Sequence, residues 1–389
     1  MRAPRRIQRR ANMSAALKTC IDGPRTLADI AGATGVTRVA AEAIVFDLVE
    51  LGWLEEVAVT PAAPRLGRPA AHIGLHSALG QVLSIDIGAH HATSMTADLS
   101  GAILASERIE LAEDLIARDR LDASIDLGRR VLARNRDLPV WTCTLASPGV
   151  VHEGVVAYFG GEGMPGWKGV RLDEEFSDAL GTRVRSAGDC ALGARGESWR
   201  GAAAAFDDVV YILAGKRTGA ASVINHRVHE GLFGAAGLIG ELPQLRWREL
   251  EEEIFADALY DGASLTREDL ILAARRSDSR ALSALDEYAE VLALGAAAMI
   301  LALAPQCLVV GGQYSADADL FLPRLSEAID RLCPFAPEVV VSTLGADAVV
   351  QGGIRLALDD ILDRLDSIVQ GADFFPAAIP ESLWAEDRR

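Results

Sequence analysis

The chain has 389 residues, of which 50% are hydrophobic and 24% are charged. This composition is typical of a globular protein and excludes a disordered or fibrous chain, and the length suits a small domain joined to a large one. A net charge of -17 argues against nucleic-acid binding by the molecule as a whole.

Cysteine usage and hydropathy indicate a reducing compartment. The five cysteines are scattered and never form a CxxC pair, so we expect neither a disulfide framework nor a zinc site. No apolar segment follows the N-terminal arginines, as a secretory signal would require. The longest apolar stretch, residues 291–304, is too short for a bilayer and predicts a buried helix. We therefore expect a cytoplasmic protein without membrane contact.

Charge is distributed unevenly along the chain. Residues 1–72 carry ten Lys or Arg against seven Asp or Glu, a balance of +3 that leaves -20 for the remainder. A mildly basic N-terminal region can approach phosphates while the acidic remainder stays soluble and repels DNA. DNA is therefore a candidate partner of the N-terminal region alone.

The first elements along the chain are short helices. A helical pattern over residues 14–21 is followed by Thr26, which we expect to cap a second helix. Gly35 then supplies a tight turn, and Thr37 caps a third helix that runs to about Leu51. Two helices joined by a glycine turn are typical of a helix-turn-helix.

A strand pattern at residues 52–57 and a later strand complete this region, which predicts a winged helix-turn-helix domain over residues 1–76. The third helix should enter a DNA major groove, where Thr37 and Arg38 are the candidate contacts. Few other side chains on that helix can hydrogen-bond to base edges.

The tip of the predicted wing offers further DNA contacts. Arg65 and Arg68 flank Gly67 and can meet a minor groove or phosphates. The arginine-rich arm at residues 2–10 can add to specificity. The alternative interpretation of the tip is a solvated linker.

From residue 81 the pattern changes to β-strands, with a hairpin around Ser100-Gly101. Asp86 ends an apolar strand and Gly88 follows it closely. This arrangement resembles the start of actin-like ATPase domains, in which the aspartate lies near the metal and phosphate and the glycine lets the backbone approach phosphate.

Six further motifs follow in the remainder of the chain. In order and spacing they resemble the ROK family of repressors, uncharacterised reading frames and sugar kinases, over roughly residues 10–365. The repressor branch is the closer resemblance, because the kinases lack the N-terminal domain. The motifs are Leu145-Ala-Ser-Pro-Gly-Val-Val, Met164-Pro-Gly-Trp-Lys-Gly-Val, Gly188-Asp-Cys-Ala-Leu-Gly-Ala-Arg-Gly-Glu, Gly231-Leu-Phe-Gly-Ala-Ala-Gly, Leu308-Val-Val-Gly-Gly and Gly352-Gly-Ile-Arg-Leu-Ala-Leu.

The resemblance implies an α/β fold: a two-lobed, actin-like (ribonuclease-H-like) sugar-kinase domain over residues 80–370. One lobe would span about residues 80–190 plus a C-terminal return, and the other residues 190–350. Sugar and nucleotide would lie between the lobes. Residues 371–389 would form a C-terminal tail outside the folded body.

The two phosphate loops implied by the resemblance depart from the kinase pattern. The first keeps Asp86 and Gly88 but has histidines where kinases have threonine and lysine. The second keeps Gly215 and Gly219, but Lys216, Arg217 and Ala221 replace a threonine and two glycines. Close approach of phosphate becomes harder, and we interpret both loops as vestigial. The alternative is that Lys216 and Arg217 hold phosphate by charge.

The catalytic and sugar positions of the family are also altered. Asp189 stands where the kinases have their general base, but Gly188 replaces the asparagine before it. Glu241 and Gly163 stand at sugar positions whose usual residues are lost, and His91 and Glu162 are further polar candidates. The zinc-ligand segment of the family is missing, so no metal or cofactor is expected. The candidates for ligand binding are Gly149, Gly163, Trp167, Asp189 and Glu241.

These features predict a DNA-binding transcription regulator of carbohydrate metabolism, of the repressor type and without enzymatic activity. Its partners would be an operator, a small-molecule effector such as a sugar or a derivative, and further copies in a homodimer or homotetramer. The alternatives are a sugar kinase that transfers phosphate from ATP to a hexose, and a scaffold that has lost both DNA and ligand.

Overall fold

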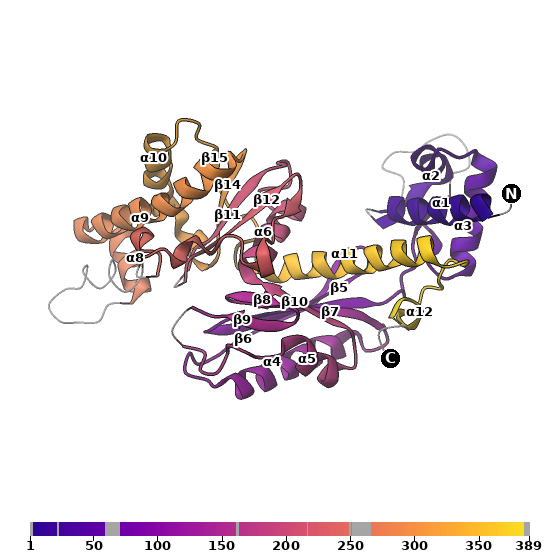
Figure 1. The fold of residues 1–389 in the computed structure, drawn as a ribbon, viewed down its shortest axis with the longest axis horizontal. Helices are drawn as coiled ribbons and strands as arrows, with labels where there is room; N and C mark the ends of the chain where they lie inside the picture. Colours follow the sequence, from indigo (N-terminus) through magenta and orange to yellow (C-terminus); the bar gives the residue numbers. More distant parts are fainter. Residues whose placement is uncertain are drawn as a thin grey trace.

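The computed structural model describes residues 3–21, 23–58, 71–160, 163–215, 217–248, 250 and 266–384. Its N-terminal unit, here called the head, stands at one end of a two-lobed body (Figure 1). The head consists of three helices and a small antiparallel sheet of order β1-β3-β2. The helices are α1 (Ala3–Ile21), α2 (Leu27–Thr34) and α3 (Arg38–Glu50), and the strands are β1 (Arg25–Thr26), β2 (Leu54–Val57) and β3 (His72–Leu75).

Local hydrogen bonds explain where the head helices begin and end. Thr26 and Asp29 form a reciprocal capping box at the start of α2, and Gly35 ends that helix in the left-handed conformation at φ 68°. The Thr37 hydroxyl accepts a hydrogen bond from the Ala40 N–H and caps α3. These three predicted signals are confirmed. The first helix is longer than predicted, since α1 begins at Ala3.

The first lobe of the body contains a five-stranded mixed sheet of order β10-β7-β4-β5-β6. Its central strand β4 is buried along its whole length, as expected for an apolar strand covered on both faces. The strands are β4 (Gln81–Ile87), β5 (His91–Asp98), β6 (Ile103–Glu110), β7 (Val140–Ser147) and β10 (Val184–Gly188). Further elements are α4 (Ala117–Leu132), η1 (Ala133–Asn135), α5 (Leu172–Leu180) and the hairpin of β8 (Val150–His152) with β9 (Val155–Tyr158).

The second lobe repeats the same strand arrangement in the order β13-β12-β11-β14-β15. In each sheet the first three strands are antiparallel, and the next two are parallel to the first. The strands are β11 (Val209–Leu213), β12 (Gly219–Ile224), β13 (Arg227–Val228), β14 (Cys307–Gly311) and β15 (Glu338–Val341). The helices are α6 (Asp189–Arg200), η2 (Leu232–Gly234), η3 (Leu238–Glu241), η4 (Pro243–Leu245), α8 (Arg267–Arg275), α9 (Ser279–Leu303), η5 (Gln313–Leu320), α10 (Leu322–Leu332) and η6 (Gly345–Asp347).

Helix α11 (Ala348–Gly371) runs from the junction of the lobes to the head (Figure 1). The N-terminal end of α11 crosses α6, and glycines let the two helices come close together. A Cβ at Gly352 would overlap the carbonyl oxygen of Leu192, and a Cβ at Gly196 would overlap that of Ala348. The Gly352 motif noted in the sequence therefore serves the packing of two helices where the lobes join.

The C-terminal segment is part of the folded body, so the expectation of a tail outside it is wrong for residues 372–384. Helix α12 (Pro380–Trp384) buries Leu383 and Trp384. The indole N–H of Trp384 donates to the carbonyl oxygen of Trp141 at 2.9 Å, and the guanidinium of Arg183 lies 4.7 Å above the indole ring. Apolar burial holds the segment in place because it has tryptophan and leucine to bury.

Head and body share one hydrophobic core, which contains residues of α1 and α3, the first lobe and α11. Within this core the ring centroids of Trp53 of the head and Trp141 of the body lie 5.4 Å apart. Polar contacts border this core: the Arg10 Nε donates to the Val369 carbonyl at 3.1 Å, and the Ser14 hydroxyl donates to Asp366 at 2.7 Å. The head is therefore packed against α11 rather than tethered by a linker.

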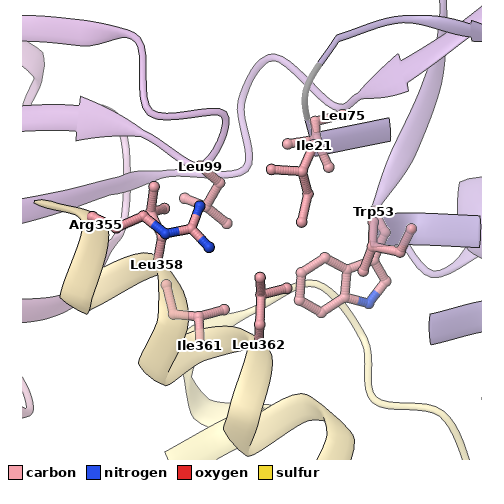
Figure 2. Close-up of a pocket in the computed structure, with 9 residues that line it drawn as sticks. Ile21, Trp53, Leu75, Leu99, Arg355, Leu358, Ile361 and Leu362 are labelled. Atoms are coloured by element: carbon pink, nitrogen blue, oxygen red, sulfur yellow. The ribbon is translucent and has the colours of Figure 1, made fainter. Parts of the chain in front are cut away.

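A small apolar cavity of about 30 Å³ remains at this junction (Figure 2). Trp53 faces it from the head, Leu99 from the first lobe, and Leu358 and Ile361 from α11, while the guanidinium of Arg355 lies at one side. A volume of this size could admit water, but its almost wholly apolar lining offers few polar partners to hold one.

Candidate functional site

Two carboxylates from separate elements of the body interact with each other. Asp86, next to the last residue of β4, is buried, and Asp189 begins α6 directly after β10 and is partly accessible. Burial, and then the negative charge of Asp86, raise the pKa of Asp189 to about 7, although the Cys190 N–H donates to its carboxylate at 2.7 Å. His91 Nε2 lies 3.6 Å from Asp86 Oδ2. The structure thus brings together three residues that the sequence analysis had singled out.

Arg120 is a buried residue of this site that the sequence analysis did not find. Its guanidinium donates to the carbonyl oxygens of Gly88 at 2.6 Å, Ala89 at 2.9 Å and Ala112 at 2.8 Å. It therefore fixes the turn between β4 and β5, where the first phosphate loop of a kinase would lie. Its only sequence signal is a charged residue on the buried face of an amphipathic helix.

The second predicted phosphate loop lies opposite this turn, at the start of β12. Arg217 stacks 4.8 Å above the ring of Phe159 and lies 3.7 Å from Glu113 Oε1, and both partners belong to the first lobe. Gly219 packs against α6, since a Cβ there would lie 2.5 Å from Cys190 Sγ. Gly215 keeps open space, with no atom nearer than 3.8 Å to an added Cβ. Lys216 lies outside the described residues.

A polar cluster joins one lobe to the other. The Tyr158 hydroxyl at the end of β9 donates to Glu241 at the end of η3, and Arg248 donates to the same carboxylate and, at 2.7 Å, to the Tyr158 oxygen. The hydrogen bond to Glu241 raises the pKa of Tyr158. A Cβ at Gly160 would lie within 2.7 Å of all three side chains. A larger residue at position 160 would therefore displace the ends of these three side chains.

The other predicted ligand residues shape the wall of the first lobe. Gly149 and Gly163 have φ values of 87° and 74°, which favour glycine, and an added Cβ at Gly149 would overlap the carbonyl oxygen of Tyr158. Trp167 is only 1% exposed, and its indole N–H donates to the Ser147 hydroxyl at 2.9 Å. Trp167 is therefore a core residue of the lobe in this structure.

Two of the predicted DNA-contacting residues lie on the head: Thr37 and Arg38 are exposed at the start of α3. The other candidates, Arg65, Gly67 and Arg68 of the predicted wing, lie outside the described residues, as does Glu162.

The described residues hold neither a metal-binding cluster nor a membrane-spanning helix. No group of three or more His, Cys, Asp or Glu side chains among them could hold a metal ion. No helix among them has the length and apolar character that crossing a bilayer requires.

Comparison with known proteins identifies the body. A sequence model of the ROK family matches residues 82–360, which is most of the chain. The chain belongs to the ROK family. The resemblance noted from the motifs is therefore confirmed.

Among curated ROK relatives, the chain is similar to the xylose repressor of Caldicellulosiruptor bescii, with 21% identity over 76% of this chain and 82% of the relative. Among solved structures it is similar to a ROK family transcriptional regulator described as a homologue of the E. coli MLC protein. That likeness has a TM-score of 0.73 and 22% identity, and covers 94% of this chain and 99% of the other.

The chain is also similar to a ROK family glucokinase from Streptomyces griseus in complex with glucose and AMPPNP. The TM-score is 0.59 and the identity 21%, with coverage of 72% of this chain and 100% of the kinase. These likenesses confirm the predicted sugar-kinase fold, built on two mixed sheets in an actin-like arrangement. The regulator's coverage of 94% must include most of the head.

Proposed function

We propose that this chain is a transcription regulator of the repressor type, in which a winged helix-turn-helix head binds an operator and a non-catalytic ROK body binds a small effector. It would act in the cytoplasm on genes of carbohydrate metabolism. The observation that carries this proposal is the joining of a ROK cleft to a three-helix, three-stranded head through one helix, α11. Two similar proteins that cover more than nine tenths of this chain, and therefore both parts, carry the names of a repressor and a transcriptional regulator.

The assignment of the head as a winged helix-turn-helix rests on the order of its elements. Helices α2 and α3 are joined by the left-handed Gly35, and β2 and β3 form an antiparallel pair on either side of residues 59–70. Helix α3 has an exposed face beginning at Thr37 and Arg38, as a recognition helix requires. The proposed DNA contacts are therefore these two residues together with Arg65, Gly67 and Arg68 of the wing.

Loss of catalysis is supported by the groups that occupy the cleft. The place of the second phosphate loop contains Arg217, which binds across to Phe159 and Glu113, so a side chain stands where bare glycine backbone would cradle phosphate. Asp86, Gly88, Gly215 and Gly219 are on this view remnants of the nucleotide site. Asp189 would bind a ligand hydroxyl without activating it.

Signalling would pass from cleft to head by movement of the lobes. Helix α11 crosses α6 where the lobes join, and its far end packs on α1. An effector that changes the angle between the lobes would therefore move α11 and the head together. In a homodimer this would change the spacing of two heads along DNA.

The test is a mobility-shift and anisotropy titration of the full chain with the DNA fragment upstream of its own gene, at several salt concentrations. We expect saturable binding that weakens with salt and is lost in Arg38→Ala. The control is Arg171→Ala, which removes an exposed arginine of the body and leaves the head unchanged. Absence of binding by the intact chain would reject the DNA-binding function.

A sugar kinase is the second candidate, and one observation favours it: the raised pKa of Asp189, about 7, suits a general base at neutral pH. Incubation of the full chain with ATP, Mg²⁺ and a panel of hexoses distinguishes the two functions. We expect no sugar phosphate. Production of sugar phosphate that disappears in Asp189→Asn would establish the kinase instead.

A further inference from the structure

The exposed face of α3 has an unusual composition for a surface helix. Val39 is 77% exposed and Phe46 is 64% exposed, and Ala43 between them is exposed as well. Their spacing places the three side chains in one stripe, opposite the face that buries Ile44 and Leu48. A surface helix normally turns polar residues toward solvent. An apolar stripe on the outer face therefore indicates a surface that binds another molecule.

The hydrogen-bonding capacity of this face is small. At the start of the helix, where recognition helices meet base edges, it consists of Thr37, Arg38 and Glu42. The Thr37 oxygen already accepts from the Ala40 N–H at 3.3 Å. Glu42 can accept only from the amino groups of bases, and its charge opposes phosphate. Polar contacts alone therefore leave most of the face without a role in reading DNA.

One feature of the major groove matches an apolar face. Each thymine presents a C5-methyl group there, and apolar side chains distinguish thymine from cytosine by contact with it. Val39 lies on the second residue of α3, directly beside Arg38, and Ala43 lies one turn further along the same stripe. Both side chains are short enough to let the helix backbone come close to the bases.

We propose that α3 reads its operator mainly through thymine methyl groups, with Val39 and Ala43 in contact with them and Arg38 supplying the polar base contact. This inference rests on the proposed DNA-binding function and adds the chemical class of base that the helix recognises. The operator half-site should then contain one or more thymines that the protein requires for their methyl groups, independently of base pairing.

The experiment begins with selection of binding duplexes from a random-sequence pool by the full chain at fixed salt. Each thymine of the selected duplex is then replaced, one at a time, by deoxyuridine, which pairs identically but lacks the methyl group. We expect at least one replacement in each half-site to weaken binding about fourfold, the effect of one methyl group no longer buried.

Two variants assign the contact to its residue. In Val39→Ala the effect of deoxyuridine at the critical position should vanish, because the methyl group has lost its partner. Val49→Ala is the matched control: Val49 is 41% exposed at the far end of the same helix and should keep the full fourfold effect. Alanine favours helix at both positions, so neither variant threatens the fold.

Four outcomes would overturn the inference. Specific binding that is indifferent to deoxyuridine at every position rejects methyl recognition while leaving DNA binding intact. An effect that persists unchanged in Val39→Ala, or a Val39→Ala variant that alters the oligomeric state in light scattering instead of DNA binding, assigns the stripe to another contact. Failure to enrich any duplex rejects this inference together with the proposed function.

Discussion

The indole N–H of Trp53 donates a hydrogen bond to the carbonyl oxygen of Pro376 at 2.8 Å. Trp53 follows the third helix of the head, and Pro376 belongs to the segment between α11 and α12. Nearby, the Ala378 N–H donates to the carbonyl oxygen of Leu51 at 2.9 Å. The C-terminal segment therefore holds the end of α3 against the body, and the position of the head depends on residues at the opposite end of the chain.

Removal of the Trp384 side chain should destabilise the packing of the C-terminal segment on the body. Trp384→Ala deletes a side chain that is 7% exposed together with its hydrogen bond to Trp141, and we expect a loss of about 3 kcal/mol in the free energy of unfolding in urea. Phe374→Ala is the control in the same segment, because Phe374 is 61% exposed, and should change stability by less than about 0.5 kcal/mol. Equal effects of the two variants would contradict the role of α12.

The crossing of α6 and α11 should tolerate no side chain. Gly352→Ala places a methyl group on the carbonyl oxygen of Leu192, so α11 must shift, and we expect a loss of at least about 3 kcal/mol or failure to fold. Gly371→Ala, at the other end of the same helix, meets no atom within 4 Å and should be neutral or stabilising by up to about 1 kcal/mol. Thermal and urea denaturation measure both.

Asp189 should make stability depend on pH. Its pKa is about 7 in the folded state against 3.8 for the free carboxyl, so the native protein holds an extra proton between these values. The free energy of unfolding therefore falls as pH rises through this window and levels off above it. An asparagine side chain cannot titrate, so the stability of the Asp189→Asn variant relative to the natural protein should increase by about 1.5 kcal/mol between pH 5.5 and 7. A difference that is constant with pH would disprove the assignment.

The polar cluster across the cleft should bias the lobes toward closure. Glu241→Gln removes the charge that joins Tyr158 and Arg248. We expect the equilibrium between closed and open forms to shift toward the open form by about 1 kcal/mol, which is about fivefold. Hydrogen exchange at residues 155–160 and small-angle scattering report this change.

Glu174→Gln is the matched control for that experiment, since Glu174 pairs with Arg171 within a single lobe. It should leave exchange and scattering unchanged. If both variants opened the cleft equally, the contact between lobes could not be the cause.

Much of the fold follows from short stretches of sequence. The capping residues Thr26 and Thr37 and the turn at Gly35 act within three or four residues, so their signals are complete in the sequence. The alternation of strands and glycine motifs likewise led to the ROK family, because each motif marks a close approach of backbone that only glycine permits.

Site residues were predicted less well where packing decides their role. Trp167 stands in a family motif, but burial assigns it to the core of the lobe. Arg120 was missed because its five carbonyl partners lie in two loops that only the folded lobe brings to one point. A charged residue within an amphipathic helix carries no sign of such partners.

The sequence by itself determined the caps of the head helices and the motifs of the family, because these signals lie among near neighbours in the chain. The two sheets followed only from the family resemblance, since they pair strands that are far apart in the chain, as Val209 pairs with Cys307. Only the tertiary structure decided that the C-terminal segment clasps the head, that α11 joins the cleft to α1, and that Arg217 and Glu241 bind across the lobes. Those contacts join residues far apart in the chain, and they exist because burying apolar surface in a shared core outweighs the entropy of ordering both ends.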